Sequence, residues 1–422
     1  MPRFQRPTGT HDILPEEQPY WEYVTNFAVR LARQAGFERI DVPIFEATEL
    51  FARGIGATTD VVEKEMYTFT DKGGESLTLR PEFTAGVVRA YIENGMHVRP
   101  QPVKLYSIGP VFRYDRPQAG RFRQFHQFNI EILGEMDPVA DLEVMRLIWD
   151  LYAGLGFRDL SFQLNSTGCP RCRSGYVQVL KEYYQEHIGE ICEDCRRRLE
   201  RNPLRVLDCK ADVCQPVIAA APPILDHLCD ECADHFARLR EYLDLLGRPY
   251  TLNHRLVRGL DYYTKTVFEV WAAGIGAQAA VCGGGRYDGL AEVLGGPPTP
   301  GVGVAAGIER IIMVMKTQEL EVPPLPRPNV FLAHLGDRAR REAVRLVDEL
   351  RRAGTAVWMA FGERGLKSQM READKRGARY VVILGEDELA RGVAAVRDMA
   401  AAEQTEIPLE ELASWLRERV AP

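Results

Sequence analysis

Side chains capable of chemistry are most concentrated between Phe112 and Gly134, in the stretch FRYDRPQAGRFRQFHQFNIEILG. This stretch is typical of a strand, a tight loop and a returning strand, and successive side chains of a strand point to opposite faces. One face would offer two guanidinium groups for phosphate, an aromatic ring for a base, an amide and a carboxylate, so we expect a substrate that is anionic at one end. A solvated face of an edge hairpin is the alternative, and the charges alone do not decide between them. The first face comprises Arg121, Arg123, Phe125, Gln127, Asn129 and Glu131, and the second Phe122, Phe128, Ile130 and Ile132.

Two further segments carry isolated charges. In TLRPEFTAG, Glu82 follows a proline that cannot join a regular strand ladder, so its carboxylate can turn into a cleft and hold an ammonium group. A glutamate that simply starts a helix is the commoner meaning of this pattern. In LVRGLDYYT, Arg258 lies among apolar residues and needs an anionic partner or ligand, because guanidinium stays charged. A structural ion pair, for instance with Asp261, is the alternative.

Two segments are rich in glycine, and in the first of them the backbone could approach a ligand closely. GGGRYDG, residues 283–289, adds Tyr287 as an aromatic wall with a hydroxyl, although a glycine turn inside a sheet also explains it. GVGVAAGIERIIM, residues 301–313, indicates a strand entering a helix with Arg310 near its start. Its glycines partly resemble a dinucleotide-binding turn, but the spacing is one residue too long and no complete strand-turn-helix unit surrounds it. A nicotinamide enzyme is therefore disfavoured.

Eight of the nine cysteines form three CxxC pairs and one looser pair. Pairs at this spacing are typical structural zinc ligands, because one short turn directs two thiolates at one ion, and eight sulfurs could complete two tetrahedral sites. Reduced, partly buried thiols without metal are an equally good interpretation. The residues concerned are Cys169, Cys172, Cys192, Cys195, Cys209, Cys214, Cys229 and Cys232.

Composition excludes several classes of protein. The hydrophobic content of 45% and the charged content of 27% are typical of soluble globular proteins. No apolar run approaches the roughly 18 residues of a membrane span, and no signal-peptide core is found, so we expect a cytoplasmic protein without membrane partners. A net charge of −7 argues against nonspecific coating of nucleic acid, while local basic patches remain compatible with it.

The 422 residues are too many for one ordinary core, and the texture of the sequence changes along the chain. A mixed part, with a helix at 16–35 and the strand-like RIDVPIFE, is interrupted by a polar, helical, cysteine-rich insertion. The proline-rich VPPLPRP then indicates a semi-rigid linker, and alternating strands and helices indicate a small α/β domain. The four parts are 1–165 with 254–321, the insertion 166–253, the linker 322–328 and the last domain 329–422.

Together these segments resemble the class II aminoacyl-tRNA synthetases and, within them, the histidyl-tRNA synthetases. The resemblance spans nearly the whole chain: VPIFE around Pro43 is similar to the dimer-forming motif 1, Phe112–Gly134 to motif 2 and Gly301–Met313 to motif 3. LVRGLDYYT and GGGRYDG resemble the two signatures peculiar to the histidine enzymes. The resemblance implies an α+β catalytic domain with an antiparallel sheet flanked by helices, a C-terminal α/β anticodon-binding domain and a homodimer.

The resemblance also implies an activity and its residues. The activity is ATP-dependent ligation of L-histidine to its tRNA through a histidyl-adenylate, with Mg²⁺ on the ATP phosphates. Arg258 and Arg113 would be catalytic, at the reacting carboxylate and α-phosphate. ATP would be bound by Arg113, Arg121, Phe125 and Arg310. Histidine would be bound by Glu82, Thr84, Arg113, Gln127, Glu131, Arg258, Tyr262, Tyr263 and Tyr287.

Basic residues outside this site would contact tRNA. The run CRRRLERNPLRVLDCK would lie on the acceptor arm, although a solvated helix face is the default meaning of such a run. In the C-terminal part, phosphate contacts would come from Arg364, Lys367, Arg371, Lys375, Arg376 and Arg379.

A catalytically inactive, histidine-binding paralogue that regulates histidine biosynthesis is the alternative function. Such proteins typically lack the anticodon-binding domain and lose active-site arginines. This chain retains Arg113, Arg258 and Arg310 and has a full C-terminal domain, so the alternative is disfavoured.

Overall fold

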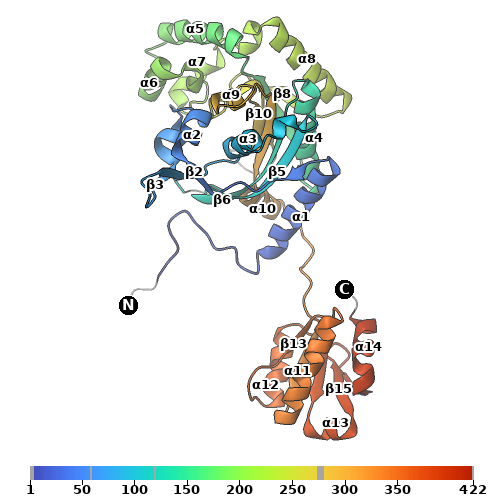
Figure 1. Cartoon of the computed structure of the whole chain (residues 1–422). Coiled ribbons are helices and arrows are strands. Elements are labelled where there is room, and N and C mark those ends of the chain that lie inside the picture. Colours follow the sequence, from blue (N-terminus) through green and yellow to red (C-terminus); the bar gives the residue numbers. More distant parts are fainter. Residues whose placement is uncertain (1–3, 58, 118–119, 273–279, 421–422) are drawn as a thin grey trace. The chain divides into compact units, whose positions relative to one another are not determined.

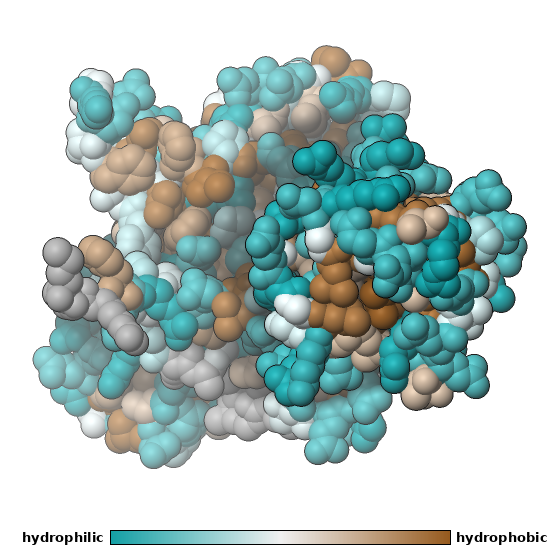
Figure 2. Space-filling model, turned by 90° about the horizontal axis from the view of Figure 1, so that it is seen from below, coloured by the Kyte–Doolittle hydropathy of each residue, from teal (hydrophilic) through white to brown (hydrophobic). Residues whose placement is uncertain are grey.

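The structure is a computed structural model that describes residues 4–57, 59–117, 120–272 and 280–420. The chain divides into two compact units, Met1–Pro323 and Pro324–Pro422 (Figure 1). The face seen in Figure 2 is hydrophilic over most of its area, with hydrophobic patches between the polar side chains. Among the described residues, no helix is both long and apolar enough to cross a membrane.

An eight-stranded sheet forms the centre of the first unit, in the order β1-β5-β6-β11-β10-β9-β7-β8. The inner pairs are antiparallel, so the expected antiparallel sheet is confirmed, while the edge pairs β1/β5 and β7/β8 are parallel. The strands are β1 (Glu38–Arg39), β5 (Val103–Phe112), β6 (Gln124–Leu133), β7 (Ser161–Ser166), β8 (Tyr250–Leu252), β9 (Thr264–Trp271), β10 (Ala280–Arg286) and β11 (Gly301–Gly307).

Helices cover both faces of this sheet (Figure 1). One face packs against α1, α4 and α10, and the other against α3 and α9. The helix α4 begins where it does because the Asp137 side chain accepts a hydrogen bond from the Val139 N–H at 2.8 Å. The bounds are α1 (Gln18–Gln34), α3 (Thr84–Glu93), α4 (Pro138–Gly154), α9 (Leu290–Val293) and α10 (Ile308–Thr317).

The β5/β6 hairpin separates apolar from polar side chains as its alternation predicted. Phe128, Ile130 and Ile132 lie in the core with α1, α4 and α10. The alternation was wrongly extended to residues 121–123, because β6 begins only at Gln124. Phe122 therefore lies outside this core and against His11, with 4.6 Å between ring centroids.

A small sheet, β2-β4-β3, lies beside the large one. We expected RIDVPIFE to form a strand, but it does not form a single one. It contributes residues to β1 and β2 on either side of Pro43, which has no N–H to donate to a ladder. The elements here are β2 (Phe45–Ala47), α2 (Thr48–Ile55), a π-helical turn (Val61–Glu65), β3 (Tyr67–Thr70), β4 (Ser76–Leu79) and a 3₁₀ turn (Met96–Val98).

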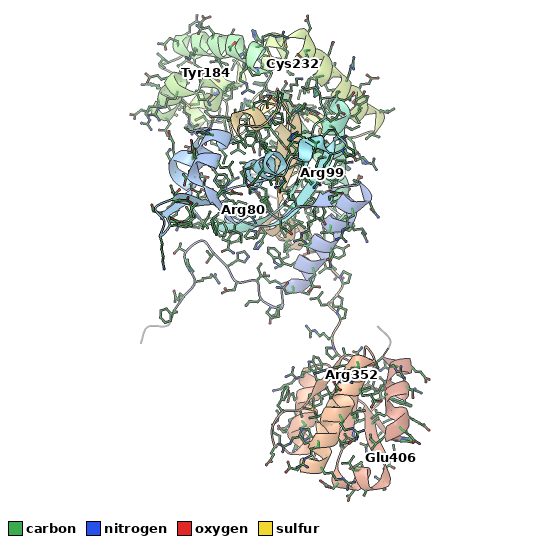
Figure 3. The ribbon with its side chains drawn as sticks, viewed as in Figure 1. Arg80, Arg99, Tyr184, Cys232, Arg352 and Glu406 are labelled. Atoms are coloured by element: carbon green, nitrogen blue, oxygen red, sulfur yellow. The ribbon has the colours of Figure 1, made fainter. Side chains whose placement is uncertain are left out.

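Between β7 and β8 the chain forms a helical layer with its own core, in which Tyr176, Leu180 and Tyr184 are buried. Figure 3 labels Tyr184 and Cys232 in this layer. The helices are α5 (Pro170–Glu186), α6 (Glu193–Arg201), α7 (Gln215–Ala219) and α8 (Asp230–Leu245), with 3₁₀ turns at Pro203–Val206, Asp212–Cys214 and Ile224–His227.

The second unit is a five-stranded sheet, β13-β12-β14-β15-β16, in which the first three strands are parallel and the last two antiparallel. Ala339, Ala343, Leu346 and Leu350 are buried on α11, as their spacing predicted. The elements are β12 (Val330–His334), α11 (Asp337–Arg352), β13 (Val357–Met359), α12 (Leu366–Lys375), β14 (Tyr380–Leu384), α13 (Glu386–Arg391), β15 (Val393–Asp398), β16 (Glu403–Pro408) and α14 (Leu409–Arg419).

Candidate active site

A cavity of about 380 Å³ opens over the middle strands of the large sheet. It collects side chains from β6, β9, α10 and the loops around them, and it brings together six of the predicted site residues. Because these residues come from segments far apart in sequence, the shared cavity is a property of the fold. The six are Arg113, Arg121, Phe125, Gln127, Arg258 and Arg310.

The floor of this cavity is built of small residues. Gln127 on β6 is directly opposite Gly307 on β11, and Gly283 on β10 is opposite Ala305. A Cβ added to Gly283 would lie 2.5 Å from the Arg258 guanidinium. Glycine is therefore required there by the close approach of a charged side chain.

Arg258 is held by a carboxylate. Its Nη1 donates to Glu269 Oε1 at 2.5 Å, and its guanidinium carbon lies 5.9 Å from the Tyr263 ring centroid. The partner that sequence reasoning considered, Asp261, instead accepts from the Asn202 side-chain amide at 3.3 Å. Arg258 is thus ion-paired and at the same time exposed to the cavity.

Arg113 and Phe125 adjoin each other at one side of the cavity. Arg113 Nε donates to the Pro81 carbonyl at 2.9 Å, and its guanidinium carbon lies 5.8 Å from the Phe125 ring centroid. Gln127 is 8% exposed, and within the described part of the chain its Oε1 has no hydrogen-bond donor. A buried amide oxygen without a donor is costly, so it is suited to a ligand N–H.

Arg310 and Arg121 complete the cationic lining. Arg310 Nη1 donates to the Ala280 carbonyl at 2.7 Å, and Arg121 Nη1 donates to Asp115 at 3.2 Å. Arg123, expected on the same face, stacks instead on Tyr114 at 3.7 Å and does not line the cavity.

Glu131 forms a second, fully buried part of the site on the same face of the sheet. Its Oε1 accepts from Thr84 Oγ1 at 2.6 Å and from the Asn129 amide at 2.9 Å, and the Tyr287 hydroxyl donates to Oε2. Burial raises the pKa of Glu131 to about 7. A Cβ on Gly303, directly opposite on β11, would overlap the carboxylate.

The aromatic residues adjoin this carboxylate. Tyr262 lies 4.8 Å from Tyr263 and 5.7 Å from Tyr287 between ring centroids. Tyr263 also packs over the backbone of β10, where a Cβ on Gly285 would lie 2.9 Å from its ring. Three phenol rings and one carboxylate therefore form one cluster.

Glu82 caps α3. Its two carboxylate oxygens accept the Thr84 N–H at 2.7 Å and the Ala85 N–H at 2.8 Å, and the Tyr262 hydroxyl lies 3.5 Å away. Burial nevertheless raises its pKa. The structure thus shows the helix-start alternative for Glu82, next to the Tyr262 hydroxyl.

Sequence reasoning missed several residues that line the cavity. Glu269 had a usable signal, because it is a lone carboxylate in the apolar strand TVFEVW. Arg205 had none beyond the basic run around it; it reaches Asp60 at 2.7 Å from the helical insertion. The other charged lining residues that were not anticipated are Asp60, Glu65, Asp115 and Glu309.

The basic run between Arg196 and Lys210 is only partly available for other contacts. Arg205 pairs with Asp60, and Arg201 Nη1 lies 3.5 Å from Glu63 Oε1. These pairs join the insertion to the loop that follows α2.

In the second unit, α12 carries three exposed basic residues at a spacing of four, Lys367, Arg371 and Lys375. Within the described residues, none of the three forms an ion pair. Arg364 and Arg376 instead bind Glu372 at 2.7 and 2.8 Å, and Arg379 approaches Asp398 at 3.6 Å.

Comparison with known proteins identifies the family. A family model described as histidyl-tRNA synthetase matches residues 9–311, and one described as anticodon binding domain matches residues 329–419. The histidine–tRNA ligase of Pelotomaculum thermopropionicum is 53% identical over 415 residues, 98% of each chain. That of Dehalococcoides mccartyi is 50% identical over 417 residues, 99% of this chain and 100% of the relative. The crystal structure of apo S. aureus histidyl-tRNA synthetase superposes with a TM-score of 0.82 at 38% identity, covering 98% of this chain and 99% of that one.

The fold is that of a class II aminoacyl-tRNA synthetase with a C-terminal anticodon-binding domain. Such proteins are ligases, and the expected fold class is confirmed. The chain belongs to the histidyl-tRNA synthetase family.

Proposed function

We propose that this chain activates L-histidine with ATP and transfers the histidyl group from the adenylate to the tRNA for histidine. The observation that carries the proposal is the arginine-lined cavity, which shares one face of the sheet with the buried Glu131–Tyr287 pair. Guanidinium groups that line a cavity suit ATP and a carboxylate, and a buried acceptor suits an imidazole N–H. The relatives are histidine–tRNA ligases by name, which supports the same substrates.

ATP would occupy the side formed by β6 and α10. Phe125 would stack on adenine, Arg113 would bind the α-phosphate, and Arg121 and Arg310 would bind the outer phosphates. The proximity of Arg113 to Phe125 supports this division, because base and α-phosphate are joined by one ribose. The spread of cationic groups along the cavity matches a triphosphate.

Mg²⁺ fits this cavity as an ion carried with the phosphates, since such sites use one or two carboxylates and the substrate. Glu65 lines the cavity and would supply one such carboxylate. When bound, the ion would neutralise charge on the departing pyrophosphate.

Histidine would occupy the other side. Gln127 Oε1 and Glu82 would accept from the amino group of histidine. Thr84 would fix the carboxylates of Glu82 and Glu131. Arg113 and Arg258 would bind the carboxylate of histidine. Glu131 would accept the ring N–H, walled by Tyr262, Tyr263 and Tyr287. A substrate without that N–H would leave Glu131 buried and unpaired, which can give large specificity ratios.

Arg258 would act at the reacting centre. Histidine carboxylate and α-phosphate are both anionic, and negative charge builds on the non-bridging oxygens as pyrophosphate leaves. A preoriented guanidinium reduces the repulsion between the two anions and stabilises the charge that develops. The bond to Glu269 keeps the guanidinium oriented in the absence of substrate.

The proposal extends to the assembly. Residues 1–165 with 254–321 would form the catalytic domain, 166–253 the insertion, 322–328 the linker, and 329–422 the anticodon-binding domain, with basic side chains of α12 on tRNA phosphates. The protein would be a cytoplasmic homodimer. An interface through the small sheet is supported by the exposure of Phe45 (50%) and Phe69 (43%) on this sheet.

The regulatory paralogue is not favoured. Arg113, Arg258 and Arg310 line one cavity, and the anticodon-binding model matches 329–419.

The test is ATP–pyrophosphate exchange with each of the standard amino acids in turn, followed by aminoacylation of tRNA for histidine. We expect exchange with histidine alone. Histidine binding without exchange would favour the paralogue, and exchange that prefers another amino acid would refute the assignment of Glu131.

A further inference from the structure

Eight cysteines from distant positions meet in two groups of four in the helical insertion. The α5/α8 cysteine cluster comprises Cys169, Cys172, Cys229 and Cys232, and the α6/α7 cysteine cluster comprises Cys192, Cys195, Cys209 and Cys214. All eight are free thiols. Figure 3 labels Cys232, near the N-terminal end of α8.

The spacing of the sulfurs matches a shared metal ion. In the α5/α8 cluster, Cys169 Sγ lies 3.7 Å from Cys172 Sγ and 3.8 Å from Cys229 Sγ, and Cys172 Sγ lies 3.8 Å from Cys232 Sγ. Four sulfurs at the usual Zn–S distance of about 2.3 Å, at the corners of a tetrahedron, lie about 3.8 Å apart. A disulfide would need about 2 Å.

The α6/α7 cluster has the same dimensions. Cys192 Sγ lies 3.8 Å from Cys209 Sγ, and Cys214 Sγ lies 3.8 Å from Cys195 Sγ. In both clusters a backbone N–H points at a sulfur, from Cys169 to Cys172 Sγ at 3.2 Å and from Cys192 to Cys214 Sγ at 3.1 Å. Four soft sulfur donors in tetrahedral arrangement favour zinc among the common ions.

The α5/α8 cluster is also bonded to the segment behind the amino-acid pocket. Arg173, next to Cys172, donates to the carbonyl of Tyr263 and, at 3.0 Å, to that of Thr167. The Lys265 N–H donates to the Gly168 carbonyl at 3.0 Å, and the Lys265 carbonyl accepts from the Thr167 N–H at 2.7 Å. From the other CxxC turn, Glu231 accepts from Lys265 Nζ at 2.8 Å.

Lys265 has a left-handed backbone conformation with φ of 48°, which a residue with a side chain rarely adopts. Both CxxC turns hold this residue, and it directly follows Tyr263 and Thr264. The conformation of the pocket wall therefore depends on how the two turns are fixed to each other.

We propose that each cysteine cluster binds one Zn²⁺ through four thiolates, and that the ion in the α5/α8 cluster positions the segment Tyr263–Lys265 for histidine binding. No electron transfer is involved: each thiol releases a proton and forms one sulfur–zinc bond. The metal count is independent of the enzyme's substrate, while the positioning role rests on the proposed function.

The first test is elemental analysis of the full chain purified without chelators. We expect about two zinc ions per chain, about one in Cys229→Ser/Cys232→Ser and about one in Cys209→Ser/Cys214→Ser. Cys282→Ala is the matched control, since Cys282 belongs to neither cluster, and it should keep the full count. Wild-type protein with zinc at background and its eight thiols free or oxidised overturns the proposal, even where a serine variant does not fold.

The second test uses Arg173→Ala, which keeps all eight cysteines but removes the contact with Tyr263. We expect about two zinc ions per chain and a rise of about tenfold or more in KM for histidine in pyrophosphate exchange, with KM for ATP nearly unchanged. Arg238→Ala, an exposed arginine on α8, is the control and should change neither value. Equal changes in both KM values, or none, would refute the positioning role.

The two proposals fail in different ways. If the proposed function is wrong, wild-type protein contains zinc but does not exchange pyrophosphate with histidine. If the zinc inference is wrong, exchange is normal in protein that contains no zinc.

Discussion

Two arginines of the site are oriented by backbone carbonyl groups, which carry no charge. Arg113 donates to the Pro81 carbonyl at 2.9 Å and Arg310 to the Ala280 carbonyl at 2.7 Å, so both are oriented without being neutralised by these bonds. Arg258 differs, because Glu269 accepts from it at 2.5 Å. The charge of Arg258 is therefore balanced before substrate arrives, and its contribution depends on what the substrate adds.

Arg258→Ala tests this contribution. We expect the rate of histidine-dependent pyrophosphate exchange to fall by about 10²-fold or more, because charge on the α-phosphate is no longer stabilised, while KM for histidine changes less. Arg255→Ala is the control: it lies on the same loop, but its guanidinium donates to Gln215 at 3.2 Å and does not line the cavity. Near-normal exchange in Arg258→Ala would remove the role assigned to it.

Glu131 gives a prediction about pH. Its folded pKa is raised to about 7, above its ordinary value of 4.5, because the carboxyl is buried. The folded state then holds a proton that the unfolded state has lost, so stability is greatest below the ordinary pKa and decreases as pH rises through about 7. Glu131→Gln stays neutral and should lack this decrease, which amounts to about 3 kcal/mol in the unfolding free energy.

Urea unfolding of both proteins at about pH 5 and about pH 8 measures this difference. Relative to wild type, the variant should gain stability at the higher pH, whatever constant cost the substitution adds. Parallel pH profiles would show that Glu131 does not titrate in this range. In Glu131→Gln the KM for histidine should also rise, since the charged acceptor for the ring N–H of the substrate is lost.

At the scale of elements, the strands β10 and β11 make room for the site at their glycine positions. Gly283 accommodates Arg258, and Gly303 accommodates Glu131 from the neighbouring strand. The sequence predicted that the glycines of residues 283–289 let backbone approach a ligand, and in the structure Gly283 approaches the Arg258 side chain instead. What they approach is set by strand register, which pairs Gly303 with Glu131 and Gly285. Register between strands so distant in sequence is a tertiary property and could not be predicted from either segment.

Gly303→Ala tests the close approach. The added methyl group would overlap the Glu131 carboxylate and lie 2.7 Å from the Ile130 carbonyl oxygen. We expect a loss of about 1–3 kcal/mol in unfolding free energy and a raised KM for histidine. Gly307→Ala on the same strand is the control, because the nearest atom to its added Cβ is Arg310 Cβ at 3.7 Å. Equal stability of the two variants would contradict the packing argument.

At the scale of the whole molecule, periodicity predicted the class of the second unit, whereas the antiparallel sheet of the first unit was expected from the family resemblance. The α/β nature of the second unit followed from alternating strands and helices, and its parallel strands β12, β13 and β14 agree with that. The antiparallel addition of β15 and β16 was not anticipated. In the first unit, the contact of Arg205 with Asp60 joins the insertion to the cavity, and nothing local to either residue indicated it.

The separation into two units predicts that tRNA binding and amino-acid activation can be altered independently. Lys367→Ala/Arg371→Ala/Lys375→Ala removes three exposed charges from α12, where they follow one stripe at a spacing of four. If these residues bind phosphate, aminoacylation should show a KM for tRNA raised by about tenfold or more and a shallower salt dependence, since fewer counterions are released. Pyrophosphate exchange, which needs no tRNA, should be unchanged.

The matched control is Arg338→Ala/Arg341→Ala/Arg345→Ala, which removes the same number of charges from α11. Equal loss of tRNA affinity in both triple variants would mean that overall charge, rather than the α12 stripe, attracts the nucleic acid.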